Sequence, residues 1–266
     1  MTRPSLVLAA FTLLCALSFF PAPTNAATSP DKDAALAKAY RFERDGWIYV
    51  HLEGSPHDVG YQHGYLLSQE IANAFAAVQL DMTHNSNRDW EFFRRAGRQM
   101  LWPKIDSEYQ AELQGIADGL AARKVKLDLD DIVAMNAFME LADYYVPWLD
   151  EQVSPPKMPK QASDKHDHCS AFVAAGSYTK NGQIVMAHNN WTDYSYGVHW
   201  NIIFDVIPEK GYAFLMDGFP GVIASDDDFG FSRMGCERQA RVCARAQSDA
   251  VLRIDRRLRE DHARRQ

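Results

Sequence analysis

Apolar and polar residues alternate along the chain with two different periods, and these periods predict its elements. Between residues 47 and 52 they alternate singly, which predicts a strand. From 59 to 78, 90 to 101, 113 to 121 and 132 to 142, apolar residues recur every three or four positions, which predicts four helices. The first half of the chain is therefore expected to be one strand followed by a helical region.

Local signals mark the start of the first helix. Ser55 is a natural N-cap, Pro56 suits the first helical position, and Asp58 lies near the positive end of the helix dipole. Gly60 and Gly64 follow on one face, where a better helix former would cost less free energy. We therefore expect this turn of the helix to pack closely on a sheet.

The second half of the chain has the period of strands. Apolar runs at 171–178 and 183–187 flank Lys180-Asn181-Gly182, and an Asn-Gly step between two such runs is a strong hairpin signal. Residues 200–207 and 212–216 predict a second hairpin.

Two stretches interrupt these patterns. Pro147 is expected to end the helical region, and residues 150–168, with three prolines and no periodicity, predict an exposed linker. From Arg233 onward, arginine dominates, lysine is absent and the strand pattern stops.

The first 26 residues have the pattern of a secretory signal peptide. Arg3 precedes an apolar run from Leu6 to Phe20, and small residues end it at Ala26. The run is short for spanning a bilayer, and no later stretch is long enough, so no stable membrane span is expected once the leader is removed. We therefore expect a secreted or periplasmic protein.

Composition and charge restrict the classes of function. The 266 residues are 47% hydrophobic and 24% charged, as in ordinary globular proteins. The net charge is −7, but leader and tail are basic, so the region between them is strongly acidic. An acidic body argues against nucleic acid as a partner.

Cysteine usage draws attention to one thiol. An exported chain enters an oxidising compartment with Cys169, Cys236 and Cys243, and an odd number leaves at least one cysteine unpaired. Pairing of Cys236 with Cys243 would leave Cys169 free. Cys169 begins the first predicted hairpin, which would bring it beside the polar residues 188–193 at the end of the neighbouring strand.

The same residues have other interpretations. Cys169 is also compatible with an ordinary core cysteine, His188 with a structural histidine, and Trp191 with core packing. His166, His168, Cys169 and His188 together suggest zinc, but their spacing fits no common ligand pattern. No cofactor or metal is therefore expected.

Four motifs resemble the phospholipase B-like family of N-terminal nucleophile hydrolases, which is related to the isopenicillin N acyltransferase-like cysteine hydrolases. The resemblance covers about residues 47 to 229. The motifs, the most specific first, are Cys169-Ser170-Ala171 followed by Ala187-His188-Asn189-Asn190-Trp191; Phe219-Pro220-Gly221-Val222 with Ser225-Asp226-Asp227-Asp228-Phe229; Gly54-Ser55-Pro56 with Gly60 and Gly64; and residues 112–131 with Asn136.

The resemblance implies a fold and a set of site residues. It implies an α+β protein with an αββα sandwich, incomplete at the C-terminus because the arginine-rich tail, attributed to a frameshift or truncation, stands where the family has further strands. It also implies self-cleavage between His168 and Cys169, after which the new α-amine of Cys169 acts as general base. His188 and Asn190 are then expected to be catalytic, and Asn189 and Trp191 to bind substrate.

These expectations divide the chain and define its function. The predicted parts are a signal peptide (1–26), a helical propeptide-like part (27–168), a catalytic β-sheet part (169–232) and an atypical tail (233–266). The expected activity is that of an exported, self-processing cysteine hydrolase acting on a carboxylic amide or ester of a small acyl or lipid substrate. The alternatives are an acyltransferase of the isopenicillin N type and a truncated, inactive lipid-binding remnant.

Overall fold

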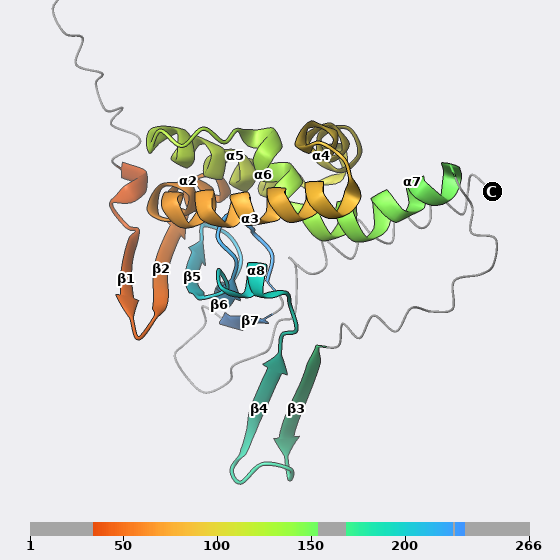
Figure 1. Cartoon of the computed structure of the whole chain (residues 1–266). Helices are drawn as coiled ribbons and strands as arrows, with labels where there is room; N and C mark the ends of the chain where they lie inside the picture. Colours follow the sequence, from red (N-terminus) through yellow and green to blue (C-terminus); the bar gives the residue numbers. More distant parts are fainter. Residues whose placement is uncertain (1–33, 154–168, 226, 232–266) are drawn as a thin grey trace, which may run out of the picture.

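The computed structural model describes residues 34–153, 169–225 and 227–231 (Figure 1). The expected signal peptide, residues 154–168 of the expected linker and the tail, with Cys236 and Cys243, lie outside the described residues. Residues 150–153, which were expected to begin the linker, are instead the end of a helix. Within these residues the chain is an α+β protein, as the resemblance implied.

The elements follow one another in a simple order. They are β1 (Tyr40–Arg44), β2 (Trp47–Gly54), α2 (Pro56–Leu66), α3 (Ser68–Ser86), α4 (Trp90–Ala96), a π-helical turn (Gly97–Leu101), a 3-10 turn (Trp102–Lys104), α5 (Ser107–Ala122), α6 (Leu129–Asn136), a second π-helical segment (Glu140–Tyr145), α7 (Val146–Val153), β3 (Ser170–Gly176), β4 (Gly182–Asn189), α8 (Tyr194–Gly197), β5 (Ile202–Pro208), β6 (Ala213–Gly218) and β7 (Asp227–Phe231).

The strands form two separate sheets. The larger sheet has the order β1-β2-β5-β6-β7, in which β2 and β5 are parallel and the other pairs are antiparallel. A parallel pair needs a crossover connection, and here all the helices from α2 to α7 and the β3–β4 hairpin lie between β2 and β5 in the chain. The hairpin is the second sheet, and it extends away from the body (Figure 1).

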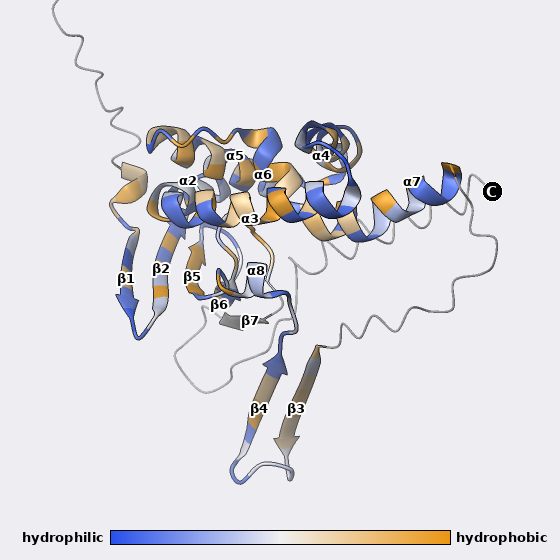
Figure 2. Ribbon diagram, viewed as in Figure 1, coloured by the Kyte–Doolittle hydropathy of each residue, from blue (hydrophilic) through white to orange (hydrophobic). Residues whose placement is uncertain are grey.

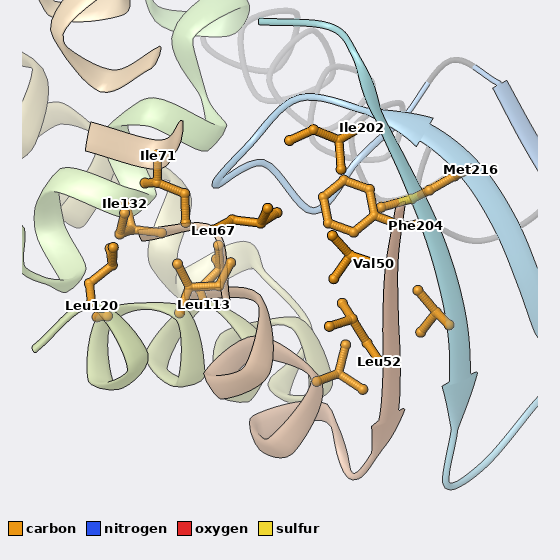
Figure 3. Packing of buried hydrophobic residues seen from close by; sticks show 14 of the residues in the cluster. Val50, Leu52, Leu67, Ile71, Leu113, Leu120, Ile132, Ile202, Phe204 and Met216 are labelled. Atoms are coloured by element: carbon orange, nitrogen blue, oxygen red, sulfur yellow. The ribbon is translucent and has the colours of Figure 1, made fainter. Parts of the chain in front are cut away.

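The main core lies between the larger sheet and the helices. Every second residue of β2 and β5 points toward the helices and is buried, as in Val50, Leu52 and Phe204 (Figure 3). Leu67 and Leu113 meet them from the helical side. In Figure 2 hydrophobic and hydrophilic residues alternate along the ribbons of the helices, as in α3, which is the pattern of helices buried on one side. The alternation of buried and less buried residues along β2 confirms the predicted strand at residues 47–52.

The start of α2 follows the sequence prediction. Ser55 is the N-cap, its side chain accepts from the backbone N–H of Asp58, and the Asp58 carboxylate accepts in return from the Ser55 N–H. This capping box satisfies two backbone donors that the first turn would otherwise leave without partners. Pro56 occupies the first helical position.

The glycines of α2 pack against a helix, and the expectation of a sheet was wrong. Gly60 and Gly64 face Gly115 and Gly119 of α5, and a Cβ built on any of the four would collide with backbone atoms of the other helix. Two helices approach this closely only where side chains are missing from both contact faces. Spacing on one helix cannot reveal whether its partner is a helix or a sheet.

Two further predictions differ from the structure. β1 lies in a stretch without a strand signal, and its pairing with β2 through a turn at Asp45 and Gly46, both with positive φ, makes it an edge strand. Pro147 does not end the helical region but is the second residue of α7, where a missing N–H costs little. Within the described residues, no helix has the length and apolarity needed to cross a membrane.

Candidate active site at the start of β3

Cys169 lies at the base of the β3–β4 hairpin, immediately before the first residue of β3. The predicted hairpin is present, but Asn181-Gly182 is not its two-residue turn: β3 ends at Gly176 and β4 begins at Gly182. In the observed register Ser170 lies opposite Asn189 and Ala171 lies opposite His188. Continuing that register places Cys169 beside Asn190, which confirms that the hairpin brings the thiol to the polar end of the neighbouring strand. Cys169 is exposed and forms no disulfide, so it is not an ordinary core cysteine.

Three contacts surround the sulfur. The backbone N–H of Trp191 donates to Sγ at 3.3 Å, and Sγ lies 3.6 Å from Oδ1 of Asn190 and 4.0 Å from the carbonyl oxygen of Trp191. An N–H directed at a sulfur stabilises negative charge on it, and the thiolate is the form of cysteine that attacks carbonyl carbons. This arrangement supplies a nucleophile with polar groups beside it.

The other predicted site residues occupy different faces of the hairpin. His188 precedes Asn190 by two residues, so it lies on the same face, two residue pairs further along the strands. Asn189 lies on the opposite face, where its amide nitrogen is 3.5 Å from Oγ of Ser170. Trp191 is 68% exposed, so an acyl chain can contact it.

The zinc interpretation finds no support among the residues that the structure describes. These residues contain no group of three or more histidine, cysteine or acidic side chains placed to hold a metal ion. His166 and the proposed cleavage residue His168 lie outside the described ranges.

A second polar arrangement holds the turn that follows β6. The backbone N–H of Gly221 donates to Nε2 of His63 at 2.9 Å, and Asn136 donates to the Gly221 carbonyl at 2.7 Å. Asn136 also accepts from the N–H of Ile223 at 2.9 Å. Gly221 has a φ of +83°, and a Cβ there would press on Ile71 and Met135, so the position favours glycine. Gly221 and Asn136 belong to two of the four sequence motifs, and His63 stands next to Gly64 of a third, so these distant segments meet in one packed unit.

The buried His63 makes stability depend on pH. Burial lowers the pKa of His63 to about 3, and its neutral Nε2 accepts the hydrogen bond from Gly221. The unfolded chain takes up the proton near pH 6.5, so this contribution to stability is complete above that pH and is lost as the pH falls toward 3. We expect the contribution of His63 to the free energy of unfolding to be about 2 kcal/mol smaller at pH 5 than at pH 7. Burial raises the pKa of Glu112 to about 8, so this carboxyl changes the stability in the opposite direction over the same range. The effect of His63 is therefore measured by urea titration as the difference between the wild type and a His63 variant.

Variants isolate the effect of this histidine. His63→Gln should be less stable than the wild type at pH 7, and this difference in the free energy of unfolding should become about 2 kcal/mol smaller at pH 5. His84→Gln, at an exposed position of α3, is the matched control and should follow the pH dependence of the wild type. A difference between His63→Gln and the wild type that is the same at both pH values would contradict the assignment.

The structure also reveals a polar network that the sequence did not indicate. On the face of the larger sheet opposite the helices, Nδ1 of His51 donates to Oδ2 of Asp205 at 2.8 Å, and the Tyr49 hydroxyl donates to the same oxygen at 2.9 Å. Burial, together with this hydrogen bond, raises the pKa of Tyr49 to about 12, so Tyr49 remains a donor. The network joins β2 to β5 across 154 positions of sequence, and no local signal could have shown this pairing.

A comparison with models of protein families finds a match that covers most of the described residues. The family model described as Phospholipase B matches residues 49–237, which includes both the helical region and the hairpin with Cys169. The chain belongs to the phospholipase B-like family.

Two relatives of this phospholipase B-like chain are distant. An uncharacterized protein of Archaeoglobus fulgidus is 23% identical over 193 residues, which cover 67% of this chain and 30% of that protein. Phospholipase B-like protein C of Dictyostelium discoideum is 22% identical over 216 residues, which cover 69% of this chain and 38% of that protein. The chain thus matches only about a third of the length of these relatives.

Proposed function

We propose that this phospholipase B-like chain is an exported, self-processing cysteine hydrolase that cleaves a carboxylic amide or ester of an acyl or lipid substrate. The observation that carries the proposal is the exposed thiol of Cys169 at the start of a strand, with a backbone N–H 3.3 Å from its sulfur. Family membership supports a lipid substrate, and the leader at residues 1–26 supports export.

The first step would be cleavage of the chain itself. Sγ of Cys169 attacks the carbonyl carbon of His168, and the bond from that carbon to the Cys169 nitrogen breaks, which gives a thioester and a free α-amine. Water then opens the thioester, leaving a carboxylate on His168 and restoring the thiol. Cys169 becomes the first residue of a new chain, the arrangement that defines an N-terminal nucleophile hydrolase.

Turnover of substrate would use the same sulfur. The new α-amine takes the proton of the thiol, because it loses its own proton closer to neutral pH than a lysine does. The thiolate attacks the substrate carbonyl, the amine or alcohol leaves with a proton, and water hydrolyses the acyl-thioester. Asn190 and His188 lie on the face of the hairpin that would meet the developing oxyanion, where hydrogen-bond donors lower the barrier most.

The αββα sandwich that we propose for this chain has a place for the exposed hairpin that carries the site. An αββα sandwich needs a second layer of strands against the sheet face that carries Tyr49, His51 and Asp205. The β3–β4 hairpin is the candidate for that layer, since apolar residues occupy both of its faces.

Mass and N-terminal sequence of the exported protein test the proposal. We expect two fragments, one of which begins Cys169-Ser170-Ala171-Phe172, and an N-terminal fragment that lacks the leader. A chain that stays intact through prolonged incubation in the folded state would overturn self-processing and would favour an inactive lipid-binding remnant. For active material, product analysis with and without an added amine separates hydrolysis from acyl transfer, because both proceed through the same acyl-thioester.

A further inference from the structure

The contacts to the Cys169 sulfur come from a segment that strand pairing does not hold. The N–H of Trp191 donates to Sγ at 3.3 Å, and Asn190, the other residue in contact with the sulfur, directly precedes it. Both residues follow Asn189, which is the last residue of β4 and the last that pairs with β3. The place of the Trp191 N–H therefore depends on what fixes the chain on its other side, toward α8.

The helix α8 follows almost at once. Only Thr192 stands between Trp191 and Asp193, the N-cap of α8. The carbonyl of Asp193 accepts from the N–H groups of Tyr196 and Gly197 at 3.0 and 2.8 Å. A helix of four residues is not stable alone, because nucleation costs more free energy than so few hydrogen bonds return. Contacts with the rest of the protein therefore hold α8 in place.

Tyr196 makes these contacts. It is the one buried residue between Asn189 and Val198. Its hydroxyl donates to Oδ2 of Asp81 in α3 at 2.7 Å, and Asn85 donates to the other oxygen of this carboxylate at 2.8 Å. Burial and the hydrogen bond to Asp81 raise the pKa of Tyr196 above its ordinary value, so the hydroxyl remains a donor. α8 accordingly lies beside α3 in Figure 1.

The ring of Tyr196 packs on aromatic residues of the core. It stacks on Phe138 with 5.3 Å between the ring centroids and lies 6.3 Å from the ring of Phe219. Phe219 is fully buried and also contacts the ring of Trp200, just beyond α8, at 5.4 Å. It belongs to the turn that hydrogen bonds to Gly221 hold in place. α8 is thus tied to the core by a hydroxyl on one side and by aromatic packing on the other.

We propose that Tyr196 is a positioning residue for the thiol of Cys169. By anchoring α8 it holds the Trp191 N–H toward Sγ, where this donor stabilises the thiolate. Tyr196 is buried, so it acts through the backbone of residues 191–193 and not by contact with a substrate. Its role in turnover rests on the function proposed above, whereas its effect on the thiol is measured without a substrate.

An anchor with a purely structural role would affect the thiol differently. Cys169 is already exposed, so a looser α8 would not slow a small reagent by blocking its access. Loss of a donor to the sulfur does slow the reagent, because the thiolate is the form that reacts. The direction of the change in reactivity therefore separates positioning of the N–H from general loosening.

Alkylation of Cys169 by iodoacetamide at pH 7 in the full chain tests the proposal. Tyr196→Phe keeps the ring and removes the hydroxyl, and it should slow the reaction about fivefold. Asp81→Leu removes the same hydrogen bond from α3 and should slow the reaction equally, whereas Asp81→Asn keeps an acceptor oxygen and should react like the wild type. Peptide mass spectrometry separates Cys169 from Cys236 and Cys243, and it compares chains that begin at Cys169 separately from chains that continue upstream.

Two further variants test the route and control for stability. Trp191→Pro removes the N–H itself and should slow alkylation about tenfold, and adding Tyr196→Phe to it should cause no further loss. Ile116→Val alters the core between the larger sheet and the helices, outside the cluster that contains Tyr196. It should lower the urea midpoint but leave the alkylation rate unchanged.

Several results would overturn the positioning role. They are a Tyr196→Phe protein that reacts as fast as the wild type or faster, an unaffected Trp191→Pro protein, and equal slowing in Ile116→Val. A chain that shows the expected slowing but hydrolyses no acyl substrate would refute the proposed function and support the positioning role. An active hydrolase in which Tyr196→Phe leaves alkylation unchanged would do the reverse.

Discussion

Replacing Cys169 by alanine is expected to abolish both the cleavage at residue 169 and the turnover of substrate. The alanine variant has no nucleophile and retains the hairpin, because Cys169 is exposed and precedes the first paired residue of β3. The mass of the purified variant should be that of the chain without its leader, and its rate on an acyl amide or ester should fall by at least about a thousandfold.

Two companion variants make this result specific. Cys169→Ser keeps a weaker nucleophile and should cleave itself slowly or not at all. Ser170→Ala removes a neighbouring hydroxyl on the other face of the hairpin and should be processed like the wild type. An alanine variant that is still cut between residues 168 and 169 would show that another group, or another protease, performs the cleavage.

Adding a single methyl group at the crossing of α2 and α5 is expected to be strongly destabilising. Gly60→Ala places a Cβ against the carbonyl oxygen of Glu112, and Gly115→Ala places one against the carbonyl oxygen of His57. These neighbours are backbone atoms and cannot rotate away, so the helices must separate and lose packing along their whole contact. We expect each variant to lower the free energy of unfolding by about 3 kcal/mol, measured by urea denaturation at pH 7.

Gly97→Ala provides the matched control for these two variants. Gly97 is also buried and helical, but a Cβ there would come no closer than 3.4 Å to a side-chain methyl of Val133. This is ordinary van der Waals contact, and alanine has the higher helix propensity, so the change should be neutral or slightly stabilising. Equal losses at Gly97 and at Gly60 would mean that helix propensity or burial, and not the close approach of α2 and α5, determines the effect.

Local chemistry made several features predictable. The start of α2 at Ser55, the strand at residues 47–52 and the existence of the hairpin that carries Cys169 all depend on residues close together in sequence. The register of the hairpin was less predictable. A two-residue turn at Asn181-Gly182 would place Cys169 opposite Tyr194, whereas the longer loop between Gly176 and Gly182 places it beside Asn190.

Features that join distant segments could not be found in this way. The sequence showed that Gly60 and Gly64 need a close neighbour but not that Gly115 and Gly119 provide it. Likewise, His63 and Asn136 stand 73 positions apart in ordinary helical patterns, yet both bind the turn at Gly221. The network of Tyr49, His51 and Asp205 depends on the parallel pairing of β2 with β5, which is set by the packing of the helices between them.

The sequence by itself determined the family and the class of fold and drew attention to the thiol of Cys169, because short motifs and periodic patterns encode these features locally. Only the tertiary structure decided which helix meets α2, what holds the turn after β6, and that Tyr49, His51 and Asp205 meet on the side of the larger sheet opposite the helices. These properties arise from contacts between segments that the chain brings together only on folding, where shape and burial decide which residues meet.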